Sequence, residues 1–417
     1  MGLPVRVRVP LLARWAGPYG SSEDNDMTTR PPEKARAASR LLLDTWCEEK
    51  LEAAVDDLRR RIGGMADVAF VFVSPDWSPH LAELVEVVQI GLRCPHVVGC
   101  SAAGLVATGG ESESVPGCSL LALRLPEATI RVEEWSANPE RWPERPVEGS
   151  AAVLLGSPVR LAADPWLVEW NKLYPGRPAF GGLASGGMDP ASMFLFTEKG
   201  VSDAAALAIH FGGAVRVLGV HGASSRAVGF PYVVTGVHGN SVLSLGGMPA
   251  YARLEEVLED ARRKGGDGLL KQGALHVGLA ASEKEPGEVV VRPILGADEG
   301  SGALAVACQP RVGQTLSFHL RDPGRADEVW RRELEGLARR AGSEGPVAGL
   351  LFPCLGRGTG FFQSPDHDAG LLADLLGRFP LAGCFANGEF APMGGRLQAH
   401  AFSVVGALFM ADGGASG

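Results

Sequence analysis

One stretch of the chain gathers residues that could do chemistry between two apolar runs. Residues 351–395 read LFPCLGRGTGFFQSPDHDAGLLADLLGRFPLAGCFANGEFAPMGG. The guanidinium of Arg357 is a planar donor that suits a carboxylate, and the carboxylate of Glu389 can accept from an ammonium group. Together the two side chains match the two ends of a free amino acid. The stretch therefore favours a binding site for a small polar ligand.

Small and polar residues that close strand ends elsewhere in the chain extend this candidate site. In α/β architectures, side chains that follow neighbouring strands converge on one crevice. Turns rich in small residues also let backbone N–H groups approach a ligand closely. The expected ligand-binding residues are Arg357, His367, Cys384, Asn387, Gly388, Glu389, Cys100, Ser101 and Ser185.

Each part of this site also has a structural interpretation. Arg357 and Glu389 could pair with each other or with backbone carbonyls, which would organise the turn without any ligand. The acidic residues from Asp366 to Asp368, around His367, stand at the start of a predicted helix, where the helix dipole favours them. The glycines of the turns could serve tight turn geometry alone. Both interpretations stay open at the level of sequence.

The elements that must position these residues recur three times. Each unit has a buried strand, a polar or Gly/Pro turn, a helix, and a second strand closed by a small-residue turn, which is the form of a βαβ crossover between parallel strands. The strand pairs are VAFVFVSP (68–75) with PHVVGCSAAG (95–104), AAVLLGSP (151–158) with RPAFGGLASGG (177–187), and VAGLLFPC (347–354) with PLAGCFANGE (380–389). Such repetition indicates internal duplication.

Further strands and helices fill the rest of the chain. Apolar residues at helical spacing in 81–88 predict a helix that covers a sheet, and Thr45 followed by Glu48 predicts a capping box at the start of an earlier helix. Strand-like runs outnumber those in the three crossover units, which favours mixed sheets over one parallel sheet. The sequence therefore predicts an α/β fold with mixed sheets covered by helices and arranged in two lobes.

Composition divides the chain into three parts. Residues 1–40 include a segment rich in Ser, Asp, Thr and Pro, and we predict a disordered N-terminal extension there. The chain loosens again between 221 and 236, where Gly, Ser and Pro replace charged runs. The junction between the lobes is placed in that segment, so the predicted domains are residues 41–222 and 230–409.

These motifs resemble the FIST family. The turn from Cys354 to Gly358, the His367–Asp368 pair, PLAGCFANGE and His400 resemble the FIST C-terminal domain. FVFVSPDW (70–77), VVGCSAAGLVATGGE (97–111) and GGLASGG (181–187) resemble the FIST N-terminal domain. The resemblance implies a sensory module for small ligands, with amino acids as the usual suggestion. The family occurs alone or with signalling outputs in bacteria and with an F-box in eukaryotes, and this sequence resembles the bacterial type without either addition.

Overall composition argues against several classes of partner. A net charge of −9 and the lack of a long basic patch argue against nucleic-acid binding. No run reaches the ~18 to 20 apolar residues that a membrane span needs. Arg6, Arg8 and Arg14 interrupt the N-terminal segment, which spoils a secretory signal. A cytoplasmic protein without membrane contact is therefore expected.

The seven cysteines are scattered through apolar runs, which favours reduced, buried thiols over a disulfide framework. A zinc site made from Cys354, His367, Cys384 and His400 would lack close-spaced ligand pairs, so no metal is expected. No phosphate-binding or dinucleotide-binding motif occurs in the required context, so the sequence implies no cofactor.

The sequence as a whole predicts a small-ligand-binding sensory protein of intracellular signal transduction, with an amino acid or related metabolite as ligand and a separate signalling protein as output partner. Two alternatives remain. A thiol enzyme would use Cys354 or Cys384 as nucleophile and His367 as base. A protein-interaction adaptor would carry an exposed apolar patch. For the sensor, replacing Arg357 by alanine is expected to abolish ligand binding and to leave the melting temperature of the free protein nearly unchanged.

Overall fold

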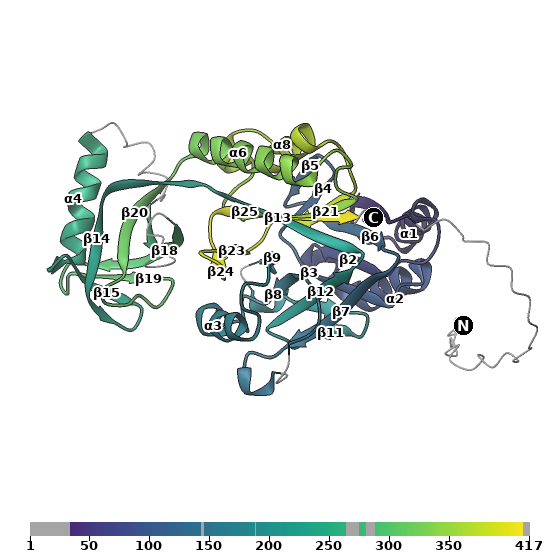
Figure 1. The fold of residues 1–417 in the computed structure, drawn as a ribbon, viewed down its shortest axis with the longest axis horizontal. Coiled ribbons are helices and arrows are strands. Elements are labelled where there is room, and N and C mark those ends of the chain that lie inside the picture. Colours follow the sequence, from purple (N-terminus) through teal and green to yellow (C-terminus); the bar gives the residue numbers. More distant parts are fainter. Residues whose placement is uncertain (1–33, 143–145, 188, 264–274, 281–287, 412–417) are drawn as a thin grey trace, which may run out of the picture. The chain divides into compact units, whose positions relative to one another are not determined.

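Figure 1 shows the fold in the computed structural model, which describes residues 34–142, 146–187, 189–263, 275–280 and 288–411. These residues form three copies of one pattern of strands and helices, which we name repeats 1, 2 and 3. A β-barrel is inserted into repeat 3. Among the described helices, none is long and apolar enough to cross a membrane.

Repeat 1 has a strand and a helix, a βαβ crossover, a hairpin and a returning strand. Its elements are β1 (Arg36–Leu43), α1 (Glu48–Ile62), β2 (Val68–Val73), η1 (Pro75–His80), α2 (Leu81–Leu92), β3 (His96–Ser101), β4 (Gly104–Ala107), β5 (Gly110–Glu113) and β6 (Gly117–Arg124). In its described residues, repeat 2 has a short 3-10 turn where repeat 1 has its first helix. Its elements are β7 (Ala128–Trp135), η2 (Pro139–Arg141), β8 (Ala151–Gly156), α3 (Ala163–Leu173), β9 (Ala179–Leu183), η3 (Pro190–Ser192), β10 (Leu195–Thr197), β11 (Gly200–Ser202) and β12 (Ala206–Gly213).

Repeat 3 follows the order of repeat 1, with the barrel between its first strand and first helix. Its elements are β13 (Val215–Ala223), α6 (Pro323–Ala341), β21 (Ala348–Pro353), α7 (Thr359–Phe362), α8 (His367–Leu376), β22 (Leu381–Cys384), β23 (Glu389–Met393), β24 (Arg396–His400) and β25 (Ser403–Ala411). The inserted barrel consists of β14 (Ser225–His238), β15 (Ser241–Leu245), β16 (Met248–Pro249), α4 (Ala250–Arg263), β17 (Leu275–Ala280), β18 (Val289–Asp298), β19 (Ala303–Val306) and β20 (Thr315–Arg321). Its strand order, β14-β20-β17-β18-β19-β15, closes because β15 also pairs with β14.

Each repeat supplies the centre of one six-stranded sheet. The strand orders are β1-β6-β2-β3-β10-β11, β7-β12-β8-β9-β23-β24 and β13-β25-β21-β22-β4-β5. The two strands of each crossover are parallel, namely β2 with β3, β8 with β9, and β21 with β22. Their other neighbours in each sheet are antiparallel. The repeated strand-helix-strand units and the mixed sheets predicted from the sequence are therefore confirmed.

The last two strands of each sheet come from a different repeat. Repeat 1 donates the β4–β5 hairpin to the sheet of repeat 3. Repeat 2 donates β10–β11 to the sheet of repeat 1, and repeat 3 donates β23–β24 to the sheet of repeat 2. This exchange is cyclic, so the three repeats close on one another.

In each crossover, a glycine at the same position of the second strand permits close approach to the first strand. An added Cβ atom would lie 2.0 Å from a carbonyl oxygen of the neighbouring strand at Gly99, 1.9 Å at Gly181 and 1.8 Å at Gly383. Real Cβ atoms do not approach an oxygen this closely. The glycine that the three second strands share is therefore required by close packing of the two strands of each crossover.

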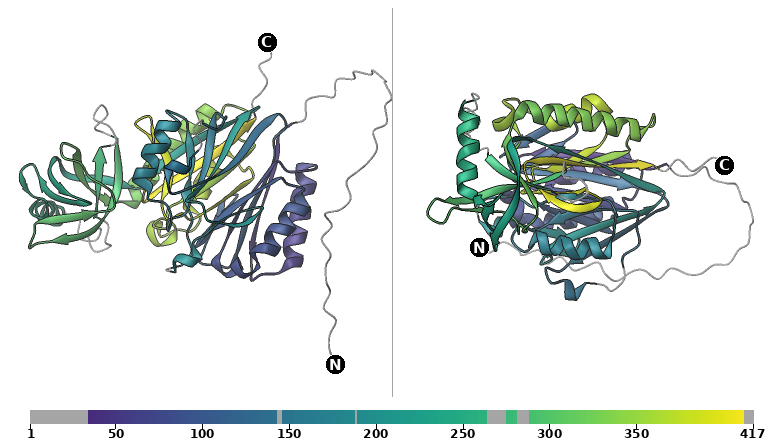
Figure 2. Two further views of the ribbon diagram at one scale, coloured as in Figure 1. Left: turned by 90° about the horizontal axis from the view of Figure 1, so that it is seen from below. Right: turned by 60° about the vertical axis from the view of Figure 1, so that its left-hand side comes forward.

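A shared core lies between the three sheets, and helices cover their outer faces. Apolar side chains from β2, β8 and β21 belong to one buried cluster, together with those of their neighbours. Helices α1 and α2 pack on the sheet of repeat 1, α3 on that of repeat 2, and α6 and α8 on that of repeat 3. Figure 2 shows α1 and α2, in purple, along the outer face of their sheet. The barrel has a separate core, to which α4 contributes.

Two local predictions at the start of the chain need correction. Strand β1 begins at Arg36, inside the segment 1–40 that the sequence predicts to be disordered, because its eight residues pair with β6. Residues 1–33 of that segment lie outside the described residues. Helix α1 begins at Glu48 with Cys47 at its N-cap, so Thr45 does not form the predicted capping box. The backbone N–H of Thr45 instead donates to the carboxylate of Asp44 at 2.8 Å.

Residues 221–236, in which the lobe junction is predicted, lie largely in paired strands. Strands β13 and β14 run through residues 221–236, and the chain leaves repeat 3 for the barrel between them, at Ser224. The chain returns at Asp322, before α6. Strand pairing with β25 and β20 orders this segment, which composition alone does not show.

Candidate functional site

A bidentate ion pair between Arg357 and Asp368 lies at the centre of the candidate site. Arg357 follows β21 in the turn before α7, and Asp368 is the second residue of α8. The guanidinium donates from Nε to Oδ2 at 2.6 Å and from Nη2 to Oδ1 at 2.7 Å. The exposed fractions of the two side chains are 0% and 1%. Burial opposes ionisation of Asp368, but the adjacent guanidinium prevails and holds the pKa of the carboxyl below its ordinary value.

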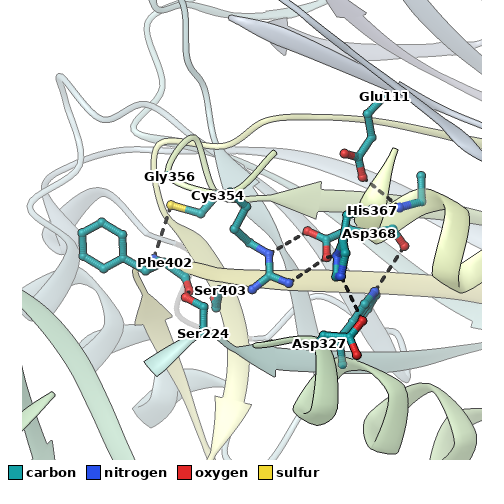
Figure 3. A network of polar contacts seen from close by, with 12 residues as sticks. Glu111, Ser224, Asp327, Cys354, Gly356, His367, Asp368, Phe402 and Ser403 are labelled. Atoms are coloured by element: carbon teal, nitrogen blue, oxygen red, sulfur yellow. Dashed lines mark hydrogen bonds and ion pairs between the residues drawn. The ribbon is translucent and has the colours of Figure 1, made fainter. Parts of the chain in front are cut away.

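His367 connects the ion pair to helix α6. Its Nδ1 lies 3.0 Å from Oδ1 of Asp368, and its Nε2 lies 3.1 Å from Oδ1 of Asp327. The imidazole stacks on Phe362 of α7, whose ring also lies 4.9 Å from the guanidinium carbon of Arg357. Figure 3 shows His367 between Asp368 and Asp327. The half-buried His367 and Phe362 thus separate the ion pair from solvent.

Glu389, at the start of β23, is a second buried acid of this site. Its Oε2 accepts from the backbone N–H of Ser403 at 3.1 Å and from the Ser403 hydroxyl at 2.6 Å. Burial raises the pKa of Glu389 to about 8, against the lowering effect of hydrogen bonds from Ser403 and Cys354 and of the charge on Arg357. The side chain is therefore mainly a neutral carboxylic acid at pH 7. Burial also raises the pKa of the Cys354 thiol beside it.

Arg357 and Glu389 each have one side-chain polar atom without a hydrogen-bond partner among the described residues. These atoms are Nη1 of Arg357 and Oε1 of Glu389, and both are buried. An unsatisfied buried polar atom is rare and costs about 1–3 kcal/mol. The charge of Arg357 acts to lower the pKa of Glu389, yet no described hydrogen bond joins the two residues. A donor and a carboxyl oxygen therefore remain available in one buried cluster.

Two histidines line the same cluster. The rings of His221 and His400 have centroids 4.1 Å apart. Burial, followed by the charge of Arg357, lowers the pKa of His221 to about 4. Burial, followed by the proximity of His221, lowers the pKa of His400 well below its ordinary value. Both rings are therefore uncharged near pH 7, and Arg357 supplies positive charge without competition from them.

Repeat 1 reaches this site through its donated hairpin. Glu111 accepts from the backbone N–H of Ala369 at 2.8 Å, and Glu113 accepts from that of Thr359 at 2.8 Å. Both N–H groups belong to the first turns of α8 and α7, where intrahelical partners are missing. Burial, followed by repulsion from Asp368, raises the pKa of Glu111 to about 8. Carboxyl groups from repeat 1 thus position the two short helices of repeat 3.

The serines of the predicted set join the repeats to each other. Ser101 accepts from the backbone N–H of Phe194 at 3.0 Å. The Ser185 hydroxyl donates to the carbonyl of Phe385 and accepts from the N–H of Ala103 at 2.9 Å. Ser185 therefore links all three repeats.

The remaining predicted residues also lie where the three repeats meet. Cys100 and Cys384 are buried, free thiols, and burial, followed by the neighbouring Cys100 thiol, raises the pKa of Cys384. The carbonyl of Gly388 accepts from the backbone N–H of Leu183 at 2.8 Å. Asn387 is exposed, and its side-chain amide lies 3.8 Å from the sulfur of Met193. The structure thus brings Arg357, His367 and Glu389 into one cluster and places the other six at the junction of the repeats, where no described hydrogen bond joins them to Arg357.

In the described part of the chain, His367 does not pair with the thiol of Cys354 or Cys384. Both ring nitrogens of His367 face carboxylates, and the sulfur of Cys354 accepts from the backbone N–H of Phe402 at 3.3 Å. Within the described ranges, no group of three or more His, Cys, Asp or Glu side chains could hold a metal ion. The thiol-enzyme and zinc interpretations therefore gain no support from these contacts.

Sequence reasoning missed several members of the cluster. Glu111 is separated by 258 residues from Ala369, whose N–H it accepts. Ser403 lies 14 residues beyond Glu389, and His221 lies on β13 before the barrel. No local motif marks these residues, because the exchanged hairpin and the pairing of β13 with β25 bring them to the site. Asp327, at helical spacing on α6, looks like any exposed acid in the sequence.

Two family models match the chain. The model of the FIST N domain matches residues 67–248, and that of the FIST C domain matches residues 250–392. The chain belongs to the FIST family. This confirms the resemblance carried by the turn motifs. FIST domains are associated with sensory signal transduction. The boundary between the two FIST matches falls inside the inserted barrel, beside β16, and repeat 3 extends on both sides of it.

Similar chains occur in mycobacteria. An uncharacterised protein of Mycobacterium tuberculosis is 31% identical over 379 residues, which cover 86% of this chain and 95% of the relative. An uncharacterised protein of Mycobacterium bovis is 31% identical over 383 residues, which cover 87% of this chain and 95% of the relative. The similarity therefore extends over both FIST domains.

Proposed function

We propose that this FIST protein senses a small zwitterionic metabolite, with an amino acid as the leading class, through the cluster of Arg357 and Glu389. The supporting observation is the pair of unsatisfied buried atoms, Nη1 of Arg357 and Oε1 of Glu389. A ligand carboxylate would accept from Nη1, and a ligand ammonium group would donate to Oε1. Each contact would satisfy an atom that has no hydrogen bond among the described residues.

Ligand access requires the cover over the cluster to move. Helix α7 has four residues and lies between Gly358 and Gln363, whose φ angles are 81° and 57°. Its described side-chain contacts near the site are few, namely the ring of Phe362 on His367 and Arg357, the ring of Phe361 at 4.5 Å from the guanidinium carbon of Arg321, and the cap that Glu113 provides at Thr359. Short segments with few buried contacts open at low free-energy cost. A ligand that binds the open and closed forms with different affinity would shift their populations, and a separate signalling protein could read that shift.

Thermal unfolding tests the proposal. A ligand that binds only the folded state raises stability by about 2.7 kcal/mol at a hundredfold excess over Kd. We expect at least one common amino acid to raise the melting temperature of the wild type. The positive charge of a bound ammonium group would favour the ionised form of Glu389. Glu389→Gln keeps the shape of the side chain but cannot ionise, so it should lose this response.

Glu333→Gln, on the exposed face of α6, is the matched control and should respond as the wild type does. The Arg357 variant is a poor test because its partner Asp368 is buried. If no amino acid or related metabolite stabilises the wild type, or if Glu389→Gln responds as Glu333→Gln does, the proposed ligand site is wrong.

A further inference from the structure

A cleft of about 600 Å³ lies between helix α3, strand β24 and the inserted barrel. Leu167, Val168 and Leu397 line it from the side of the repeats, and Leu279 and Val290 line it from the barrel. Small-molecule sites are mostly apolar hollows of roughly 300–1,000 Å³ with a few polar groups. The volume of this cleft falls in that range, and its lining combines apolar side chains with polar and charged ones.

A buried arginine joins the two walls. Arg292 of β18 is only 8% exposed. It donates to Oδ1 of Asp164 on α3 at 3.2 Å and to the backbone carbonyl of Ala399 on β24. The other carboxylate oxygen of Asp164 accepts from the backbone N–H of Gln309 at 3.3 Å. The walls are therefore held together by specific polar contacts on both sides.

The cleft contains two arginine side chains that are available to bind an anion. Neither Arg311 nor Arg396 has a hydrogen-bond or ion-pair partner for its guanidinium within the described part of the chain, and both line the cleft. The two acids among the described lining residues are already engaged, since Asp164 pairs with Arg292 and Glu169 pairs with Lys172 at 2.7 Å.

The thiol in the lining adds no negative charge. Burial raises the pKa of Cys308 to about 11, so this side chain is neutral near pH 7. Two guanidinium groups without a partner in the described part of the chain therefore lie beside the apolar side chains of the cleft.

We propose that this cleft binds a small organic anion, with its apolar body against Leu167, Leu279 and Val290 and its anionic group held by Arg311 and Arg396. Guanidinium groups suit carboxylates and phosphates, which accept two parallel hydrogen bonds. This site is distinct from the buried cluster of Arg357. Strand β24 connects the two, because Arg396 lines the cleft and His400, at the other end of the strand, lies in the cluster.

Two fluorescent probes with the same aromatic rings test the site. Anilinonaphthalenesulfonate carries an anionic group, and phenylnaphthylamine lacks it. Both should bind the wild type. The double substitution Arg311→Ala and Arg396→Ala should weaken binding of the anionic probe by at least roughly tenfold and leave that of the neutral probe unchanged. Val168→Trp fills the cleft from its exposed wall and should weaken both probes.

Arg332→Ala, on the exposed face of α6, is the control for loss of surface charge and should bind both probes as the wild type does. Glu389→Gln should also leave both probes unaffected, so the result does not depend on the proposed amino-acid site. Displacement of the anionic probe by naphthoate and by naphthyl phosphate then shows which anionic group the arginines prefer. Equal binding of the anionic probe by the wild type and the double variant, or unchanged binding of both probes by Val168→Trp, would overturn the proposal.

Discussion

Breaking the Arg357–Asp368 pair from one side at a time is the most direct test of how the site is built. Asp368→Asn leaves a buried guanidinium without its carboxylate. Arg357→Met leaves a buried carboxylate with His367 as its remaining charged or polar side-chain partner in the described structure. Removal of one partner from a buried ion pair costs about 3–5 kcal/mol, because the other charge stays buried without compensation. We expect each variant to lose stability in that range.

The two single losses should not be additive. The double variant leaves neither charge buried without its partner, which removes the main cause of both single losses. The double variant should therefore be more stable than Asp368→Asn alone, with a coupling energy of at least about 3 kcal/mol. The exposed pair of Arg325 and Glu328, 2.7 Å apart on α6, is the matched control. Its cycle should give about 0.5 kcal/mol or less.

Urea unfolding followed by tryptophan fluorescence and far-UV circular dichroism measures both cycles. One reporter is adjacent to the pair, because the indole N–H of Trp330 donates to the backbone carbonyl of Asp368 at 3.2 Å. If the unfolding free energy of each single variant falls by less than about 1 kcal/mol and the two cycles give equal coupling energies, the Arg357–Asp368 pair does not behave as a buried ion pair. The expectation from sequence, that loss of Arg357 leaves stability nearly unchanged, would then be restored.

Three further predictions concern single side chains. The folded state keeps Glu389 protonated up to about pH 8, whereas the unfolded chain releases this proton near pH 4.5. The free energy of unfolding therefore falls as pH rises between those values. Glu389→Gln should therefore lessen the decline in unfolding free energy between about pH 5 and 8 by up to about 1.4 kcal/mol per pH unit, and an equal decline in both proteins would contradict this. Gly383→Ala puts a Cβ atom 1.8 Å from a carbonyl oxygen of β21 and should cost about 3 kcal/mol or more in thermal unfolding, whereas Gly360→Ala, with nothing within 4 Å, should change stability by less than about 1 kcal/mol. Iodoacetamide should modify half-buried Cys47 before buried Cys384, whose pKa burial raises, and mass spectrometry showing the reverse order would revive the thiol-enzyme alternative.

The local units of the fold could be predicted because their signals are contained in short segments. All six residues of β2 are buried, as expected for a strand covered on both faces, and the apolar spacing in 81–88 falls on α2. The start of α8 at His367 follows from its acidic first turn. These features depend on neighbours in sequence, which are visible in the chain itself.

The long-range arrangement could not be predicted in the same way. The pairing of Val106 with Gly383 joins residues of repeats 1 and 3, and neither strand carries a mark of its partner. The role of Asp368 was ambiguous for a related reason. A carboxylate in the first turn of a helix is favoured by the helix dipole alone. Only the structure shows that Arg357 binds it from the preceding turn.

The cyclic exchange of hairpins determines when each hairpin can pair with its partner strand during synthesis on the ribosome. The β4–β5 hairpin is complete at Glu113, but its partner strand β22 begins only at Leu381. At about 5–20 residues per second, the hairpin waits on the order of 10 to 50 s for that partner. During this interval Val106, fully buried in the finished protein, has no sheet to join. The nascent chain therefore carries an open strand edge through most of its synthesis, and the last repeat to emerge closes the first.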